Sequence, residues 1–180
     1  PRMHPSVHAQ THPDKPAFIM ASTGAVTTYR QLDEASNRVA QMLRALGLKT
    51  GDAIAIFMEN NPHYLALTWG AQRSGLYYTC ISSRLTAGEA AYIVKDCGAR
   101  AFFSSEAMGE IAREMPAHLR GVACFMVGGA ASGYRNFEEA QAAYPSTPVA
   151  DESSGADMLY SSGTTGRPKG VRVPLPAEPA

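Results

Sequence analysis

The stretch from residue 53 to residue 81 reads AIAIFMENNPHYLALTWGAQRSGLYYTCI and carries the signals of one strand–helix–strand unit. Residues 53–58 are continuously apolar, which is typical of a strand buried on both faces of a parallel sheet. The Asn-Asn-Pro sequence at residues 60–62 marks a helix start, because asparagine caps helices and proline fits their first turn. The helix is expected to stop at Gly75, and residues 76–81 then form a second apolar strand. Two such strands joined by a helix predict parallel pairing.

The same alternation continues on both sides of this unit. Upstream, residues 15–20 and 25–28 read as paired strands, and a helix begins where Thr28 and Gln31 form a capping box. Downstream, Thr86 and Glu89 open another helix, which closes at Gly98. Further helices are predicted at residues 106–114 and 136–143, and further strands at 100–103, 122–127 and 158–161. This order predicts an α/β fold, a layered and mostly parallel sheet flanked by helices.

Composition narrows the classes of function. The chain has 180 residues, 45% of them hydrophobic and 18% charged, which indicates a folded globular protein. Sixteen Lys and Arg balance sixteen Asp and Glu, which argues against a nucleic-acid binder or a polybasic membrane anchor. No run approaches the ~20 apolar residues of a transmembrane helix, and no signal peptide is visible. We therefore expect a cytoplasmic protein.

Cysteine and histidine offer two possible metal sites, and neither is favoured. Cys80, Cys97 and Cys124 are widely spaced and odd in number, so we expect three small buried side chains rather than disulfides or a zinc site. The histidines at residues 4, 8 and 12 recur at helical spacing and could share a metal ion. Because no carboxylate or cysteine completes that set, we favour a short polar surface helix.

A glycine-rich segment, YSSGTTGRPKG at residues 160–170, contains the residues that best indicate a ligand-binding site. Its glycines allow tight turns that bring backbone N–H groups close to an anion, and its hydroxyls and cations suit a polyphosphate. The residues concerned are Ser161, Ser162, Gly163, Thr164, Thr165, Gly166, Arg167 and Lys169. The glycine spacing differs from that of a P-loop kinase or GTPase. The alternative is a flexible linker. Because ligands bind at the carboxyl ends of parallel strands, the loop is expected at such an end of the sheet.

Residues 161–170 resemble the phosphate-binding signature of the adenylate-forming enzymes, a superfamily of acyl-CoA synthetases, luciferases and peptide-synthetase adenylation domains. Two shorter elements upstream support the resemblance. TYRQL at residues 28–32 resembles an early family element, and WGAQRSG at residues 69–75 resembles a helix end before the second core motif. The resemblance covers about residues 13–173. VRVPLP at residues 171–176 departs from the polar Ser-His element of many members and is similar to bacterial fatty-acid or aryl-acid CoA ligases.

The resemblance implies an ATP-dependent acyl-CoA synthetase, an acid–thiol ligase. A carboxylic acid reacts with Mg-ATP to give an acyl-adenylate and pyrophosphate, and coenzyme A then takes the acyl group. The cofactors implied are ATP, Mg2+ and coenzyme A. Ser161, Ser162, Gly163, Thr164, Thr165, Gly166, Arg167 and Lys169 are implied to hold the ATP phosphates. The adenine, Mg2+ and coenzyme A sites and the catalytic lysine are expected outside these 180 residues.

The resemblance also implies an incomplete enzyme, because family members are about three times as long. The chain is expected to be the N-terminal part of the large adenylation domain, and to be inactive alone. We divide it into a leader and hairpin (1–27), alternating helices and strands (28–143), a linker (144–156), the strands and loop of the phosphate site (157–173) and a tail (174–180). Two alternatives remain open: an adenylation domain that loads a carrier protein, and a non-catalytic scaffold that binds nucleotide or pyrophosphate.

Overall fold

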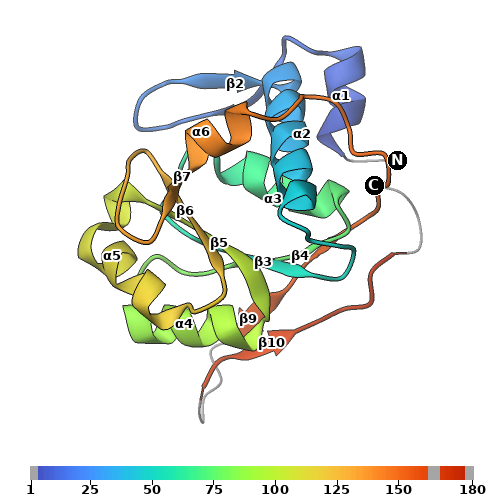
Figure 1. The fold of residues 1–180 in the computed structure, drawn as a ribbon. Coiled ribbons are helices and arrows are strands. Elements are labelled where there is room, and N and C mark those ends of the chain that lie inside the picture. Colours follow the sequence, from blue (N-terminus) through green and yellow to red (C-terminus); the bar gives the residue numbers. More distant parts are fainter. Residues whose placement is uncertain (1–3, 162–166, 177–180) are drawn as a thin grey trace.

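A computed structural model describes residues 4–161 and 167–176. Its centre is a six-stranded sheet in which every neighbouring pair is parallel (Figure 1). In spatial order the strands are β7 (Arg135–Asn136), β6 (Ala123–Val127), β5 (Ala99–Ser105), β3 (Ala53–Phe57), β4 (Tyr77–Cys80) and β8 (Ala156–Asp157). The predicted α/β class with a parallel sheet is therefore confirmed.

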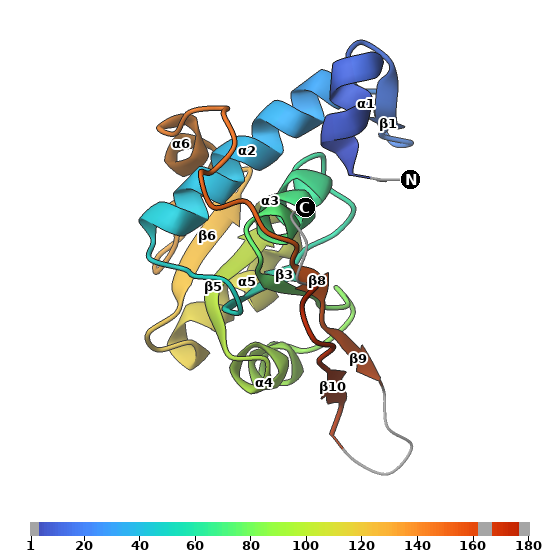
Figure 2. The same ribbon diagram turned by 90° about the vertical axis from the view of Figure 1, so that its right-hand side faces the viewer.

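Helices cover both faces of the sheet (Figure 2). One face packs against α2 (Tyr29–Ala45), α3 (Tyr64–Arg73) and α6 (Phe137–Ala142), and the other against α4 (Ala87–Asp96) and α5 (Gly109–His118). The position of β3 in the sheet explains why its sequence is continuously apolar. Ile54 and Ile56 enter the core under α2 and α3, whereas Ala55 and Phe57 enter the core over α4 and α5. All five residues of β3 are buried, so a polar side chain fits on neither face.

Both predicted capping boxes are present. At the start of α2 the Gln31 backbone N–H donates to Thr28 Oγ1 (3.3 Å), and the Thr28 N–H donates to Gln31 Oε1 (2.9 Å). Thr86 and Glu89 make the same reciprocal pair at the start of α4. Each box satisfies two N–H groups that have no partner within the helix. These helix starts are thus fixed by local sequence.

Several local predictions differ from the structure. The helix predicted at residues 106–114 is a short 3-10 turn, η1 (Glu106–Met108), followed by α5, because Gly109 adopts a positive φ of 57° between them. Helix α3 begins only at Tyr64, since the Asn61 side chain accepts from the His63 N–H in the preceding loop. The expectation of three buried cysteines is wrong for Cys80, which is exposed at the end of β4, whereas Cys97 and Cys124 are buried.

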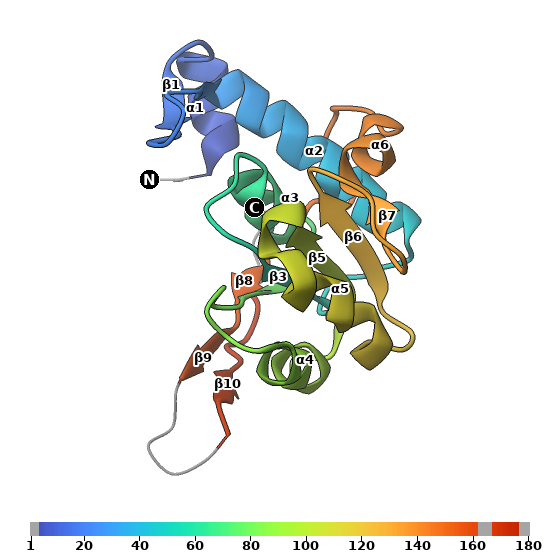
Figure 3. The same cartoon turned by 90° about the vertical axis from the view of Figure 1, so that its left-hand side faces the viewer.

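The remaining elements lie around this core. Helix α1 (Pro5–Thr11) packs on α2, and β1 (Pro16–Ile19) pairs antiparallel with β2 (Val26–Thr28). A second antiparallel pair, β9 (Leu159–Ser161) and β10 (Lys169–Val171), extends from the β8 edge of the sheet past α4 (Figures 2 and 3). None of the helices described is long and apolar enough to cross a membrane.

The residues that flank the glycine-rich loop follow the carboxyl end of β8, an edge strand of the parallel sheet, but do not belong to that sheet. The last backbone hydrogen bond between this part of the chain and the six-stranded sheet comes just after β8, where the Met158 N–H donates to the Tyr78 carbonyl (2.9 Å). The loop joins β9 to β10, which pair with each other in a separate two-stranded sheet. The predicted strand at residues 158–161 is thus one arm of a hairpin.

Candidate functional site

The β9–β10 hairpin fixes the two ends of the glycine-rich loop. Lys169 pairs with Ser161, Gly170 with Tyr160, and Val171 with Leu159. Directly opposed residues in an antiparallel pair project to the same face. The hydroxyl of Ser161 and the ammonium group of Lys169 therefore lie on one face of the hairpin at the base of the loop. Both residues are exposed, so both are accessible to a ligand held in the loop.

The opposite face of the hairpin rests on α4 through Tyr160. Its hydroxyl donates to Asp96 Oδ2 at 2.6 Å. Burial, and after it the hydrogen bond to Asp96, raises the pKa of the Tyr160 hydroxyl, so it stays a neutral donor. A side chain at position 170 would collide with this ring, because a Cβ atom there would lie 2.8 Å from Tyr160 Cζ. Gly170 thus lets the tyrosine cross the hairpin to reach the helix.

Tyr92 makes a second anchor on α4. Its hydroxyl donates to the Pro168 carbonyl (3.3 Å), and the Arg167 guanidinium carbon lies 5.2 Å from the centre of its ring. Tyr92 and Asp96 are one helical turn apart, so they present one face of α4 to the hairpin. The rigid helix therefore holds both sides of the loop.

The described part of the loop is cationic. Arg167 and Lys169 are both exposed, and neither forms an ion pair with another described residue. Arg167 also borders a surface pocket of about 410 Å³, whose wall includes Tyr92, Lys95 and His118. Exposed cations beside a hydroxyl can make charge-assisted hydrogen bonds to phosphate oxygens. The chemistry of this donor set fits a polyphosphate.

The structure brings together part of the predicted site. It places Ser161, Arg167 and Lys169 on the hairpin, as described above. The other predicted contacts, Ser162, Gly163, Thr164, Thr165 and Gly166, lie outside the described residues. Sequence reasoning missed the anchoring pair of Tyr92 and Asp96. Their spacing of four residues on a predicted helix was the one available signal, but nothing local to α4 pointed to a hairpin more than 60 residues away.

The amino-terminal histidines do not converge. His4 precedes α1 as its N-cap and is buried with its ring edge-on to Trp69, at a centroid distance of 5.1 Å. His8 packs instead on Tyr29. Burial and the charge of Arg73 lower the pKa of His4. Among the residues at 4–161 and 167–176, no group of three His, Cys, Asp or Glu side chains could hold a metal ion.

A second polar cluster lies at the carboxyl ends of β3 and β5. Glu59 accepts from Asn61 Nδ2 (2.9 Å) and from the Ser105 hydroxyl. Burial alone would raise the pKa of the Glu59 carboxyl, but these two hydrogen bonds outweigh burial and hold the pKa below its usual range. A pocket of about 660 Å³ lies beside it, lined mainly by apolar side chains such as Phe18 and Leu65. Glu59 is thus an ionised group whose oxygens are already occupied by the protein.

Comparison with known proteins supports one family. The sequence matches the AMP-binding enzyme family over residues 6–174. The fatty acid–acyl-carrier-protein ligase ScoC of Streptomyces coeruleorubidus is 35% identical over an alignment of 170 residues that covers 92% of this chain and 31% of ScoC. The long-chain-fatty-acid–CoA ligase FadD13 of Mycobacterium tuberculosis is 32% identical over 168 residues, covering 91% of this chain and 32% of FadD13.

Solved structures agree with this assignment at the level of the fold. The anthranilate CoA ligase AuaEII, crystallised with anthranoyl-AMP, matches with a TM-score of 0.81 at 24% sequence identity. The match covers 93% of this chain and 34% of that structure. The chain thus spans about a third of the length of the relatives it matches. Because the family match extends over residues 6–174, the chain belongs to the AMP-binding enzymes.

Proposed function

We propose that this chain is the N-terminal part of an ATP-dependent acyl-CoA synthetase. A carboxylate oxygen of the acid attacks the α-phosphorus of ATP, the bond between the α- and β-phosphates breaks, and pyrophosphate leaves. The thiol of coenzyme A then displaces AMP from the acyl-adenylate to form a thioester. Residues 1–180 contribute to the large adenylation domain, with residues 157–173 as its phosphate-binding part. The 180 residues alone are proposed to be inactive.

The observation that carries this proposal is the anchored cationic hairpin. Lys169 and Arg167 would neutralise the negative charge that grows on the leaving pyrophosphate, and the Ser161 hydroxyl would donate to a phosphate oxygen. The segment from Ser162 to Gly166 would supply backbone N–H groups and further hydroxyls. Because α4 holds the hairpin through Tyr160 and Tyr92, these groups need little reorganisation when charge develops.

ATP, Mg2+ and coenzyme A are the proposed cofactors. The donor set of the hairpin fits the phosphates of ATP, as its charge and hydroxyl content indicate. Mg2+ would shield the phosphate charge when bound. The proposed partners are a carboxylic acid substrate and coenzyme A.

Replacement of Lys169 by alanine tests the proposal in the full-length protein. Loss of the ammonium group should slow adenylation on the order of 10- to 1,000-fold, because one charged donor to the leaving group is lost. Lys49→Ala is the matched control, since Lys49 is also an exposed lysine but lies in the loop between α2 and β3 and not in the hairpin. The proposal predicts slow adenylation for Lys169→Ala and a normal rate for Lys49→Ala. An unchanged rate in Lys169→Ala would remove this residue from the mechanism.

Loading of a carrier protein is a second candidate, because the relative ScoC is named as a ligase that uses an acyl-carrier protein. Both candidates share the adenylation step and differ only in the thiol that accepts the acyl group. The discriminating assay offers preformed acyl-adenylate and full-length protein to coenzyme A and, separately, to a phosphopantetheinylated carrier protein. Faster transfer to coenzyme A supports the synthetase, and faster transfer to the carrier protein replaces it with the second candidate.

Calorimetry on the 180 residues tests the remaining alternative, a non-catalytic scaffold that binds nucleotide or pyrophosphate, by measuring how tightly each of these two ligands binds. Because we expect the adenine site to lie outside them, ATP and pyrophosphate should bind equally weakly. Tight binding of ATP relative to pyrophosphate would contradict this division of the nucleotide site.

A further inference from the structure

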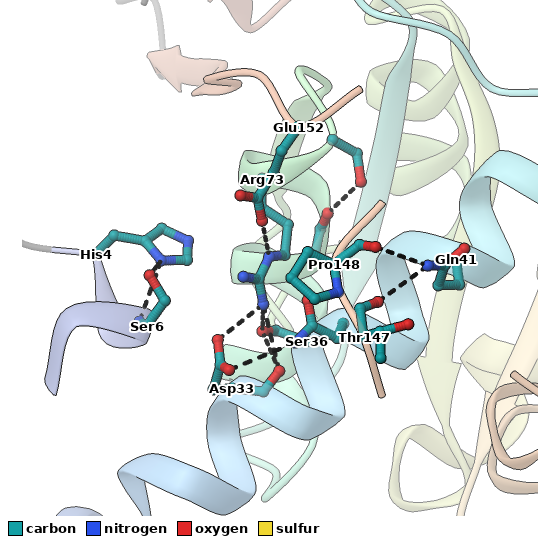
Figure 4. A network of polar contacts seen from close by, with 12 residues as sticks. His4, Ser6, Asp33, Ser36, Gln41, Arg73, Thr147, Pro148 and Glu152 are labelled. Carbon is teal, nitrogen blue, oxygen red and sulfur yellow. Dashed lines mark hydrogen bonds and ion pairs between the residues drawn. The ribbon is translucent and has the colours of Figure 1, made fainter. Parts of the chain in front are cut away.

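Arg73, the last residue of α3, is a buried cation between two carboxylates (Figure 4). Its residue surface is only 1% exposed. Nη1 donates to Asp33 Oδ1 (2.9 Å) on α2, and Nε donates to Glu152 Oε1 (2.7 Å) in the segment between α6 and β8. Nη1 also donates to Ser36 Oγ at 2.9 Å. The guanidinium group therefore joins three parts of the chain that are far apart in sequence.

Such a buried ion triad adds little net free energy to folding. Removing charges from water carries a penalty that ion pairing often only balances, and one role found for buried ionic groups in some proteins is to select a specific geometry. The planar guanidinium group has donors in fixed directions, so it donates to its two carboxylates in one arrangement. The arrangement seen here selects which residue of the segment at 144–156 lies over the end of α3.

That segment, which we call the strap (residues 144–156), leads directly to the phosphate hairpin. Beyond Glu152, the Ser153 N–H donates to the Arg73 carbonyl (3.2 Å), and the Gly155 N–H donates to the Gln72 carbonyl (2.5 Å). The Ala156 N–H then donates to the Leu76 carbonyl (3.1 Å), where β8 joins the sheet. Strand β9 begins three residues after Ala156. Backbone hydrogen bonds thus follow the chain from Ser153 to Met158, three residues before Ser161.

The other polar contacts of the strap are at the surface. Arg44 pairs with Asp151 at 3.1 Å, and this aspartate side chain is 66% exposed. Gln41 donates to the carbonyls of Thr147 and Pro148 (Figure 4). Exposed ion pairs contribute little and tolerate more than one geometry. Val149 is the buried apolar side chain of the strap, and among the strap's polar side chains Glu152 is the one that contacts a buried cation and can thereby define the register.

We propose that Arg73 is a positioning residue for the phosphate site: by holding Glu152 it fixes the register of the strap, and hence the position of Ser161 and its partner Lys169 in the hairpin. This inference rests on the proposed function of that hairpin. A slip of one residue in β8 would turn every following side chain to the opposite face of the strand. The hairpin would then be displaced relative to α4, and the Tyr160 hydroxyl would no longer face Asp96.

Glu152→Ala tests the inference in the full-length protein. Arg73 keeps Asp33 as its partner in this variant, so no buried charge is left alone and the protein should fold. The matched control is Asp151→Ala, which removes the neighbouring acid of the strap but only an exposed ion pair. Two readouts are compared: hydrogen exchange of the backbone amides at residues 155–161, and the kinetics of adenylation with ATP and acid varied separately.

We expect Glu152→Ala to exchange faster at residues 155–161 than the wild type, and Asp151→Ala to match the wild type. The value of kcat/KM for ATP should fall about tenfold or more, since small misplacements of a positioning group cost factors of this size. The KM for ATP should rise while the KM for the acid stays unchanged, whereas a general loss of folded protein would lower only the apparent kcat and alter neither KM. Unchanged hydrogen exchange in Glu152→Ala would overturn the inference, whatever the activity.

The kinetic arm separates this inference from the proposed function. If the wild type performs adenylation and Glu152→Ala exchanges faster but keeps its kcat/KM for ATP, the strap does not position the loop and the inference is overturned while the function stands. If the wild type performs no adenylation with any acid, the proposed function fails and the positioning role in the reaction fails with it. Faster exchange would then show only that Glu152 holds the strap.

Discussion

Replacing Gly155 by alanine should force β8 away from the sheet edge. A Cβ atom at this position would lie 2.2 Å from the Leu76 carbonyl oxygen and 2.8 Å from the Leu76 nitrogen, both backbone atoms. Carbon and oxygen normally approach to about 3.3 Å, so the strand must move by about 1 Å. That movement weakens two backbone hydrogen bonds, from the Gly155 N–H to Gln72 and from the Ala156 N–H to Leu76. At about 0.5–1.5 kcal/mol each, the free energy of unfolding should fall by about 1–3 kcal/mol.

Differential scanning calorimetry measures this loss. For a chain of this length each kcal/mol lowers Tm by about 2–4 °C, so the expected decrease is roughly 2–12 °C. Gly88→Ala is the control, since Gly88 lies in α4 and an added Cβ meets no atom within 4 Å. Alanine is the better helix former, so this variant should be equal to the wild type or more stable. A Gly155→Ala protein as stable as the wild type would refute the close approach of β8 to Leu76.

Three further predictions concern the amino-terminal helices and the core. Thr28→Ala should cost about 1 kcal/mol in thermal unfolding, because the α2 capping box is lost, and Thr28→Ser should restore it. Phe103→Ala should cost about 3–5 kcal/mol in urea unfolding, since this fully buried ring packs against Phe125 and Phe137. The third concerns pH: because His4 has a pKa below 6.5 when folded, the unfolded chain binds its proton first and stability should fall as pH drops through 6.5. His4→Asn, which can still cap α1, should flatten the dependence of Tm on pH between about pH 7.5 and 5.5, and an unchanged slope would contradict this assignment.

Much of the fold is predictable because its signals are local. The apolar run at β3 reflects burial on both sheet faces, and the capping boxes need only residues three positions apart. The strands β7 and β8 could not be predicted, since two residues carry no periodic pattern and both strands exist only through pairing with a neighbour. Cys80 is exposed for a similar reason: its strand ends at the rim of the sheet, and apolar sequence does not show where a strand ends in space.

The residue types of the candidate site could be recognised in the sequence, but the tertiary contacts that hold the hairpin could not. Glycines, hydroxyls and cations within one short segment indicate phosphate binding without any tertiary information. The groups that hold this segment come from elsewhere in the chain. Tyr160 finds Asp96 on α4, and Arg73 finds partners 40 residues before and 79 residues after it. An arginine in the last turn of a helix is ordinarily a surface residue that interacts with the helix dipole, so its sequence context gives no sign of burial.

Exchange of labelled pyrophosphate into ATP by the full-length protein tests the central claim most directly. The assay reports reversal of adenylation, so it needs no knowledge of the thiol that accepts the acyl group. A panel of carboxylic acids, from aliphatic to aromatic, is supplied one at a time with Mg2+. The account predicts that label enters ATP only when a suitable acid is present. Exchange that needs no acid, or no exchange with any acid in the panel, would contradict it.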